Sequence, residues 1–132
     1  MGYATHGYLP NETEKEFIRK SYSDCSAFIA ICGGFEAPRR AGLLEGKTAT
    51  APRAVLDTLR KENPETNWIE KRYAHDDKVW TTGTLLNGLD AMSAFARHTW
   101  PQKAPLVETL IAMGHWPTRD IDYKDTGNDM KL

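Results

Sequence analysis

The sequence has little that would direct the protein to a membrane or to nucleic acid. No stretch approaches the roughly 20 consecutive apolar residues that a membrane-spanning helix needs. Residues 1–10 lack the basic and apolar blocks of a secretory signal. Seventeen basic residues stand against 18 acidic ones, for a net charge of −1, and the basic residues form no stripe. These absences predict a cytoplasmic protein that binds neither membranes nor nucleic acid.

Cysteine and histidine are also scarce. Cys25 and Cys32 bracket an apolar run and, at the ends of a strand, would lie roughly 23 Å apart at about 3.3 Å per residue. A disulfide needs Cα atoms within about 7 Å, so we expect two free thiols. The four histidines show no i, i+4 spacing, and none lies in a Cys/His pair of the kind that binds zinc. No metal site is therefore predicted.

What the 132 residues do contain is an alternation of helix and strand patterns. Asn11 and Glu14 have the spacing of a capping box, which predicts a helix to about residue 23. The continuous apolar run at residues 27–31 is typical of a strand covered on both faces. Further helices are predicted at 35–44, 52–62, 85–98 and 105–113, and further strands at 48–50, 68–73 and 78–82.

This alternation predicts a parallel sheet with helices on both faces. The last two predicted strands form a hairpin, with Trp68 and Trp80 at paired positions. Residues 1–116 are assigned to the domain and 117–132 to a polar tail, expected to be irregular or loosely docked. The strands are fewer than the five or six that are usual in a doubly wound sheet.

Cys32 is the strongest candidate for chemistry, because it ends the apolar run and precedes Gly33 and Gly34. A sharp strand-to-helix turn lifts a side chain into the crevice at the carboxyl ends of the strands, where ligands bind in open α/β sheets. Glycines relieve crowding and let N–H groups point at a developing anion, and a following helix favours a thiolate. Taken alone, a buried structural cysteine is the simpler interpretation.

Several motifs around this turn resemble the ThiJ/PfpI (DJ) superfamily. They are FIAICGG at 28–34, AGLLEGKTAT at 41–50, EKRY at 70–73, KVWTTG at 78–83 and LNGLD at 86–90. The resemblance covers about residues 11–115, and its later motifs are similar to the isonitrile-hydratase-like and fungal branches. It implies a flavodoxin-like (class I glutamine amidotransferase-like) α/β sandwich, usually dimeric, that works on a small-molecule substrate without a cofactor.

The resemblance also implies roles for individual residues. Cys32 matches the nucleophile, and the Gly33 N–H matches part of the oxyanion site. Residues 1–5 are similar to the end of a glycine-rich loop of the family, which makes Gly2 a backbone candidate. The remaining candidates are Gly34 for the oxyanion site and Arg53, Thr82 and Gly83 for the pocket.

The chain departs from the family pattern in its acid–base residues. Gly33 stands where the most similar branch usually has threonine, and no histidine directly follows Cys32 or the segment at 48–50. The family's acidic partner of the cysteine belongs to a region that this sequence lacks, so we expect a domain that is truncated at its N-terminus. Glu36 is a candidate replacement acid, one helical turn beyond Cys32, although a solvated helix face explains it more simply.

The resulting prediction is a cysteine-dependent hydratase, hydrolase or lyase that acts on a small electrophile. The alternatives are a non-catalytic binding or regulatory module, and a pocket that shapes a reactive intermediate in specialised metabolism. A strand as apolar as residues 27–31 needs hydrogen-bonded neighbours on both sides. We therefore expect a homodimer, or a partner chain that completes the sheet and offers a carboxylate in trans.

Overall fold

The fold is built on two small sheets. In the first, β1 (Phe28–Ala30) pairs in parallel with β5 (Val79–Thr82), which pairs antiparallel with β4 (Tyr73–Asp76). In the second, β2 (Thr48–Ala49) pairs in parallel with β3 (Asn67–Trp68), and β2 also contacts β4. The computed structural model describes residues 9–126.

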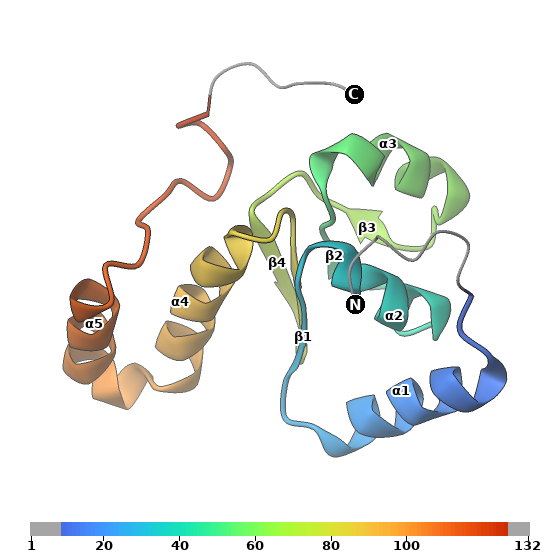
Figure 1. Ribbon diagram of the computed structural model, residues 1–132, viewed down its shortest axis with the longest axis horizontal. Coiled ribbons are helices and arrows are strands. Elements are labelled where there is room, and N and C mark those ends of the chain that lie inside the picture. Colours follow the sequence, from blue (N-terminus) through green and yellow to red (C-terminus); the bar gives the residue numbers. More distant parts are fainter. Residues whose placement is uncertain (1–8, 127–132) are drawn as a thin grey trace.

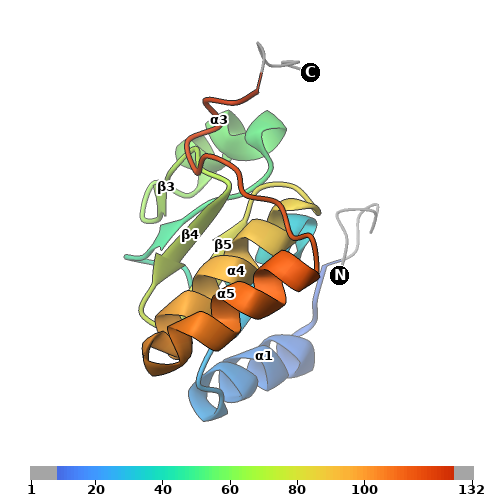
Figure 2. The ribbon, with the colours of Figure 1, turned by 90° about the vertical axis from the view of Figure 1, so that its left-hand side faces the viewer.

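Helices lie on both sides of these strands, as Figure 1 shows. On one side are α4 (Asn87–Thr99) and α5 (Ala104–Met113), which pack on each other (Figure 2). On the other are α1 (Glu12–Asp24), α2 (Glu36–Arg40) and α3 (Arg53–Glu62). The predicted α/β sandwich of flavodoxin type is confirmed.

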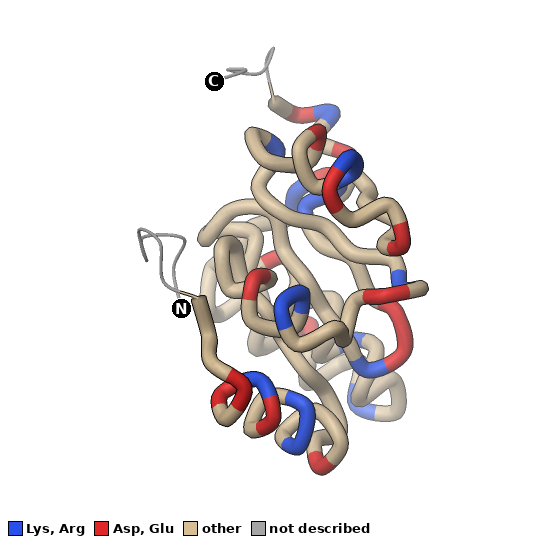
Figure 3. The backbone as a smooth tube through the Cα atoms, turned by 90° about the vertical axis from the view of Figure 1, so that its right-hand side faces the viewer, with Lys and Arg blue, Asp and Glu red and all other residues tan. Residues whose placement is uncertain are grey.

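A local signal accounts for the start of α1. The Asn11 side chain accepts from the Glu14 N–H at 3.0 Å and the Asn11 N–H donates to the Glu14 carboxylate at 2.8 Å, so the capping box at α1 is confirmed. In Figure 3, Lys and Arg alternate with Asp and Glu along α1. None of the helices within residues 9–126 combines the length and the apolar character that crossing a membrane demands.

The main core lies between the second sheet, the helix α3 and the segment around Phe35 and Leu44. Leu56 and Leu59 bury the inner face of α3 against Phe35, Leu44 and neighbouring apolar side chains. Phe35 meets the Trp68 ring edge to face, with ring centroids 5.8 Å apart. Phe35 therefore anchors the segment that follows Cys32 in the core.

The predicted pairing of Trp68 with Trp80 is wrong. Trp68 lies in β3, opposite Ala49, and β4 begins only at Tyr73. Across the hairpin Trp80 faces His75, and their rings stack with centroids 3.9 Å apart. Burial explains the difference, because Trp68 packs in the core against Phe35 and so draws its segment into the second sheet.

The segment of residues 117–126, which we call the docked segment, is irregular as expected but is not loosely held. The buried Arg72 side chain donates to the Asp120 carbonyl and to the Asp125 carboxylate. Tyr123 is buried, and both the Arg53 and the Arg72 guanidinium carbons lie 4.6 Å from its ring centroid. Figure 2 shows the segment running from α5 over the end of α4 toward α3. A buried guanidinium needs such partners, which is why an unpatterned segment docks.

Candidate functional site

Cys32 stands at the turn between β1 and a short 3₁₀ helix, η1 (Cys32–Phe35). Its φ of 53° lies in the left-handed region, which non-glycine residues rarely occupy. Such backbone strain is concentrated at functional sites, where the surrounding structure maintains it. The side chain is half-buried, and both cysteines are free thiols. The predicted sharp turn is therefore present, and it contains a strained cysteine.

Thr82 holds this turn from the neighbouring strand. The Cys32 N–H donates to the Thr82 hydroxyl oxygen at 2.9 Å, and Thr82 is fully buried. Because β1 and β5 are parallel, Thr82 ends its strand at the same edge of the sheet as Cys32. The structure thus brings together Cys32 and one of the predicted pocket residues.

The two glycines after Cys32 differ in what their N–H groups do. The Gly34 N–H donates to the Ile31 carbonyl at 2.9 Å, so it is not free to bind an anion. Within residues 9–126 the Gly33 N–H has no hydrogen-bond acceptor. Of the predicted backbone candidates, Gly33 thus keeps an N–H without an acceptor among the described residues, whereas Gly2 lies outside them.

Among the described residues, no hydrogen bond joins the Glu36 carboxylate to the Cys32 thiol. The carboxylate accepts from Arg39 at 2.7 Å and from Arg40 at 2.9 Å, which occupies the group within its own helix. Among residues 9–126, no carboxylate or imidazole is hydrogen-bonded to the Cys32 sulfur. The helix expected at 35–44 is also shorter, since α2 ends at Arg40. Within residues 9–126 the thiol thus has no hydrogen-bonded acid, and the α-helix that follows η1 is short.

The other two predicted pocket residues face the docked segment. Arg53 pairs with Glu70 and covers one side of the Tyr123 ring. The Gly83 N–H donates to the Arg72 carbonyl at 2.9 Å, and a Cβ at Gly83 would lie 2.3 Å from the Tyr123 hydroxyl. Gly83 is glycine because the docked segment approaches its backbone closely.

A buried polar network beside Gly83 was not anticipated. Asn87 accepts from the Thr84 N–H, the Thr84 hydroxyl and the Tyr123 hydroxyl, each at 2.9 Å. Its amide donates to Asp90, which pairs with Arg119. Burial raises the pKa of Tyr123, and the nearby Arg72 and Arg53 charges oppose that shift. Asn87 and Asp90 lie near the start of α4, where residues of these types most often serve as caps, so nothing local in the sequence indicates the network.

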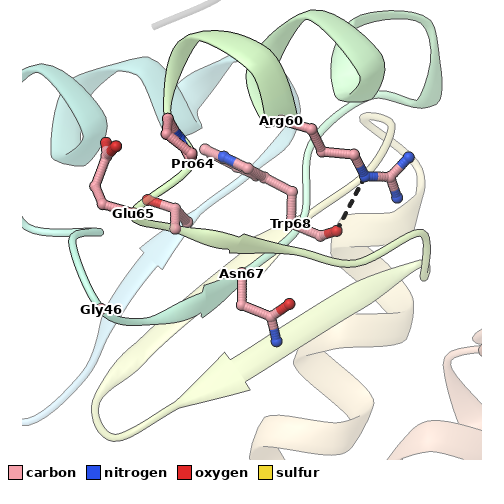
Figure 4. A pocket seen from close by; sticks show the side chains of 7 residues that line it. Gly46, Arg60, Pro64, Glu65, Asn67 and Trp68 are labelled. Carbon is pink, nitrogen blue, oxygen red and sulfur yellow. Dashed lines mark hydrogen bonds between the residues drawn. The ribbon is translucent and has the colours of Figure 1, made fainter.

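A pocket of about 480 Å³ lies apart from the turn, and no residue of η1 lines it. It is formed where α3 ends and β3 begins, and Figure 4 shows the Arg60 side chain donating to the Trp68 carbonyl at its rim. The lining residues are Gly46, Arg60, Pro64, Glu65, Thr66, Asn67 and Trp68. This pocket and the Cys32 turn are separate features.

Comparison with known proteins identifies relatives. The sequence profile described as the DJ-1/PfpI family matches residues 2–99. The fold is similar to that of a ThiJ/PfpI family protein from Pseudomonas syringae, with a TM-score of 0.66 and 19% identity over 86% of this chain and 46% of the other. Drosophila melanogaster DJ-1beta gives a TM-score of 0.63 and 15% identity over 79% of this chain and 54% of the other.

A regulator shares the fold as well. An AraC family transcriptional regulator from Pseudomonas putida gives a TM-score of 0.64 and 15% identity over 79% of this chain and 57% of the other. The chain thus spans about half the length of these three solved structures. A comparison with curated proteins finds no match.

Proposed function

This chain belongs to the DJ-1/PfpI family, and we propose that it is a cysteine-dependent hydratase, hydrolase or lyase that acts on a small electrophilic substrate without a cofactor. The observation that carries the proposal is the left-handed backbone of Cys32 at the carboxyl edge of two parallel strands. A cysteine held there by a buried threonine presents its thiol where open α/β sheets bind ligands.

The proposed chemistry begins with the thiolate. The Cys32 sulfur donates an electron pair to an electrophilic carbon, and the displaced π pair moves to the heteroatom bonded to that carbon. The Gly33 N–H, which has no acceptor within residues 9–126, hydrogen-bonds the anion that forms. Because Glu36 is paired with Arg39 and Arg40, we assign the proton donor to water or to a group of a partner chain.

Selective alkylation tests the nucleophile directly. Iodoacetamide labelling at pH 7 with peptide mapping compares Cys32 with Cys25, whose thiol donates to the Tyr22 carbonyl and which serves as the internal control. We expect faster labelling of Cys32 in the folded protein and equal rates in urea. Equal rates in the folded protein would count against a nucleophilic Cys32.

Turnover is tested by two matched substitutions. A panel of small isonitriles and 2-oxoaldehydes, which carry the small electrophilic carbon that the proposal requires, is offered to the wild type, Cys32→Ala and Cys25→Ala. We expect Cys32→Ala to abolish any turnover and Cys25→Ala to retain it. Full activity in Cys32→Ala would exclude covalent catalysis and favour a pocket that only shapes an intermediate.

The second candidate function is a binding or regulatory module. It is favoured by the absence, within residues 9–126, of a carboxylate or imidazole bonded to the Cys32 sulfur. A protein with a similar fold is an AraC family transcriptional regulator. A protein that turns over none of the panel but has a fast-labelling Cys32 would match this function. For either function we propose a cytoplasmic location.

The predicted partner is a second copy of the chain, or a chain that completes the sheet. Within the described part of the chain, β1 has a hydrogen-bonded neighbour on one side only. The Phe28 N–H donates to the Lys78 carbonyl, so alternation turns the Ile29 backbone groups to the other edge. Open edges of this kind pair with other chains. Sedimentation equilibrium at micromolar concentration checks the expectation, and a stable monomer would contradict it.

A further inference from the structure

We propose that Thr82 is a positioning residue for the Cys32 thiol, and that its hydroxyl oxygen keeps the turn in its strained, reactive conformation. The inference rests on the proposed function of Cys32. It starts from one contact, the hydrogen bond of 2.9 Å from the Cys32 N–H to the Thr82 hydroxyl oxygen. That contact joins a residue with a φ of 53° to a side chain with no exposed surface.

The Thr82 hydroxyl is oriented to accept. It donates its own hydrogen to the Thr84 carbonyl at 3.4 Å, which leaves its lone pairs for the Cys32 N–H. The backbone of Thr82 is fixed in turn, because β5 lies between β1 and β4 and Thr82 pairs with Tyr73. The acceptor is therefore part of the central strand and does not move with the turn that it holds.

The bond matters because the turn is under strain. The cost of a left-handed non-glycine residue and the net contribution of one buried hydrogen bond are of the same order. Loss of the Thr82 hydroxyl also leaves the Cys32 N–H without an acceptor, which adds a reason for the backbone to rotate. Rotation at Cys32 would move the sulfur and the Gly33 N–H together, so the thiol and the anion site both depend on Thr82.

The strand offers a matched control in the next residue. Thr81 is also fully buried, and its hydroxyl oxygen accepts from the Thr50 N–H at 2.8 Å. Thr81→Val therefore removes the same kind of hydrogen bond from the same strand, but at a backbone N–H that lies outside the turn. Thr82→Val tests the turn itself, and Thr82→Ser keeps the hydroxyl.

The experiment measures the ratio of iodoacetamide labelling rates, Cys32 over Cys25, at pH 7 in the four folded proteins. We expect Thr82→Val to lower this ratio at least about fivefold, the factor that one ordinary hydrogen bond represents. Thr82→Ser should keep the wild-type ratio. Thr81→Val should also keep it, although its stability to urea should fall about as much as that of Thr82→Val. An unchanged ratio in Thr82→Val, or an equal fall in Thr81→Val, would overturn the proposal.

Amide hydrogen exchange of the wild type tests the same bond without any variant. We expect the Cys32 N–H to exchange more slowly than the Gly33 N–H, since only the first has an acceptor among the described residues. Equal exchange at both amides would overturn the proposal even if Thr82→Val fails to fold. Equal labelling of Cys32 and Cys25 in the wild type with a protected Cys32 amide would instead refute the proposed function, so the two failures are distinguishable.

Discussion

Gly83→Ala should undock the segment of residues 117–126, because the space for a methyl group is already filled. The new Cβ would lie 2.3 Å from the Tyr123 hydroxyl oxygen and 3.0 Å from the Asn87 side-chain oxygen. Gly83 has no left-handed φ, so crowding is the cause of the effect and backbone strain is not. Forcing extra atoms into a packed site costs about 1–3 kcal/mol.

Tyr123→Phe removes the closest atom of that clash. Alone it should cost about 1 kcal/mol, the net value of one hydrogen bond, since Asn87 still accepts from the N–H and the hydroxyl of Thr84. In the Tyr123→Phe background, Gly83→Ala should lower the free energy of unfolding by less than it does in the wild type. We expect a coupling of about 1 kcal/mol or more between the two sites.

Urea unfolding, monitored by tryptophan fluorescence, gives the free energy of unfolding of the wild type, Gly83→Ala, Tyr123→Phe and the double variant. Gly46→Ala is the control, because Gly46 has a φ of 71° and nothing within 4 Å of its Cβ position. Its cost is backbone strain alone, which Tyr123→Phe cannot relieve. If the losses in free energy of unfolding for Gly83→Ala and Tyr123→Phe add to that of the double variant within about 0.5 kcal/mol, the docked segment does not approach Gly83 closely.

Two further predictions concern the core and the docked segment. Leu56→Ala, at a fully buried position of α3, should cost about 2–5 kcal/mol in urea unfolding, whereas the exposed neighbour Asp57→Ala should stay within about 0.5 kcal/mol. The hydrogen bond from Arg72 lowers the pKa of Asp125, so its stabilisation is present above the unfolded value of about 3.9 and is lost as pH falls through the folded value. Cleavage of residues 117–126 by an acid protease should therefore rise below about pH 4, and Asp125→Asn should weaken that dependence.

The sequence predicted features that depend on neighbours along the chain. The capping box at Asn11 and the apolar face of α3 act within one helix, and both are present. The sharp turn at Cys32 could be predicted because two glycines directly after an apolar run let the backbone turn where the strand ends. The left-handed φ of Cys32 itself was not predicted. Thr82 and Cys32 meet because the carboxyl ends of parallel strands lie at the same edge of a sheet. This rule can be applied to strands that are predicted from sequence.

Long-range polar contacts could not be predicted in the same way. Arg72 and Asp125 are 53 residues apart, and Tyr123 and Asn87 are 36 apart, with no periodic pattern to link them. Arg72 is buried, and a buried guanidinium needs charged or polar partners from whichever part of the chain packs against it. The prediction that Trp68 pairs with Trp80 was wrong for a related reason. Trp68 packs in the core, and this packing places it in the second sheet and not in the hairpin.

Glu36 shows how a small change in helix type can mislead a spacing argument. One turn beyond Cys32 would place the two side chains on one face of an α-helix. The segment between them is a short 3₁₀ helix whose first residue, Cys32, has a left-handed φ, so α-helical spacing does not apply there. Phe35 enters the core, and Glu36 pairs with Arg39 and Arg40.

The same geometry explains why the strain at Cys32 persists. On one side of the turn, β1 is paired with β5, and the Thr82 hydroxyl holds the Cys32 N–H. On the other side, the Gly34 N–H closes the turn onto the Ile31 carbonyl and Phe35 is locked in the core. A left-handed residue between two fixed ends cannot relax without breaking one of them. The geometry of the turn is thus imposed by the sheet and the core, and it does not require an acid hydrogen-bonded to the thiol.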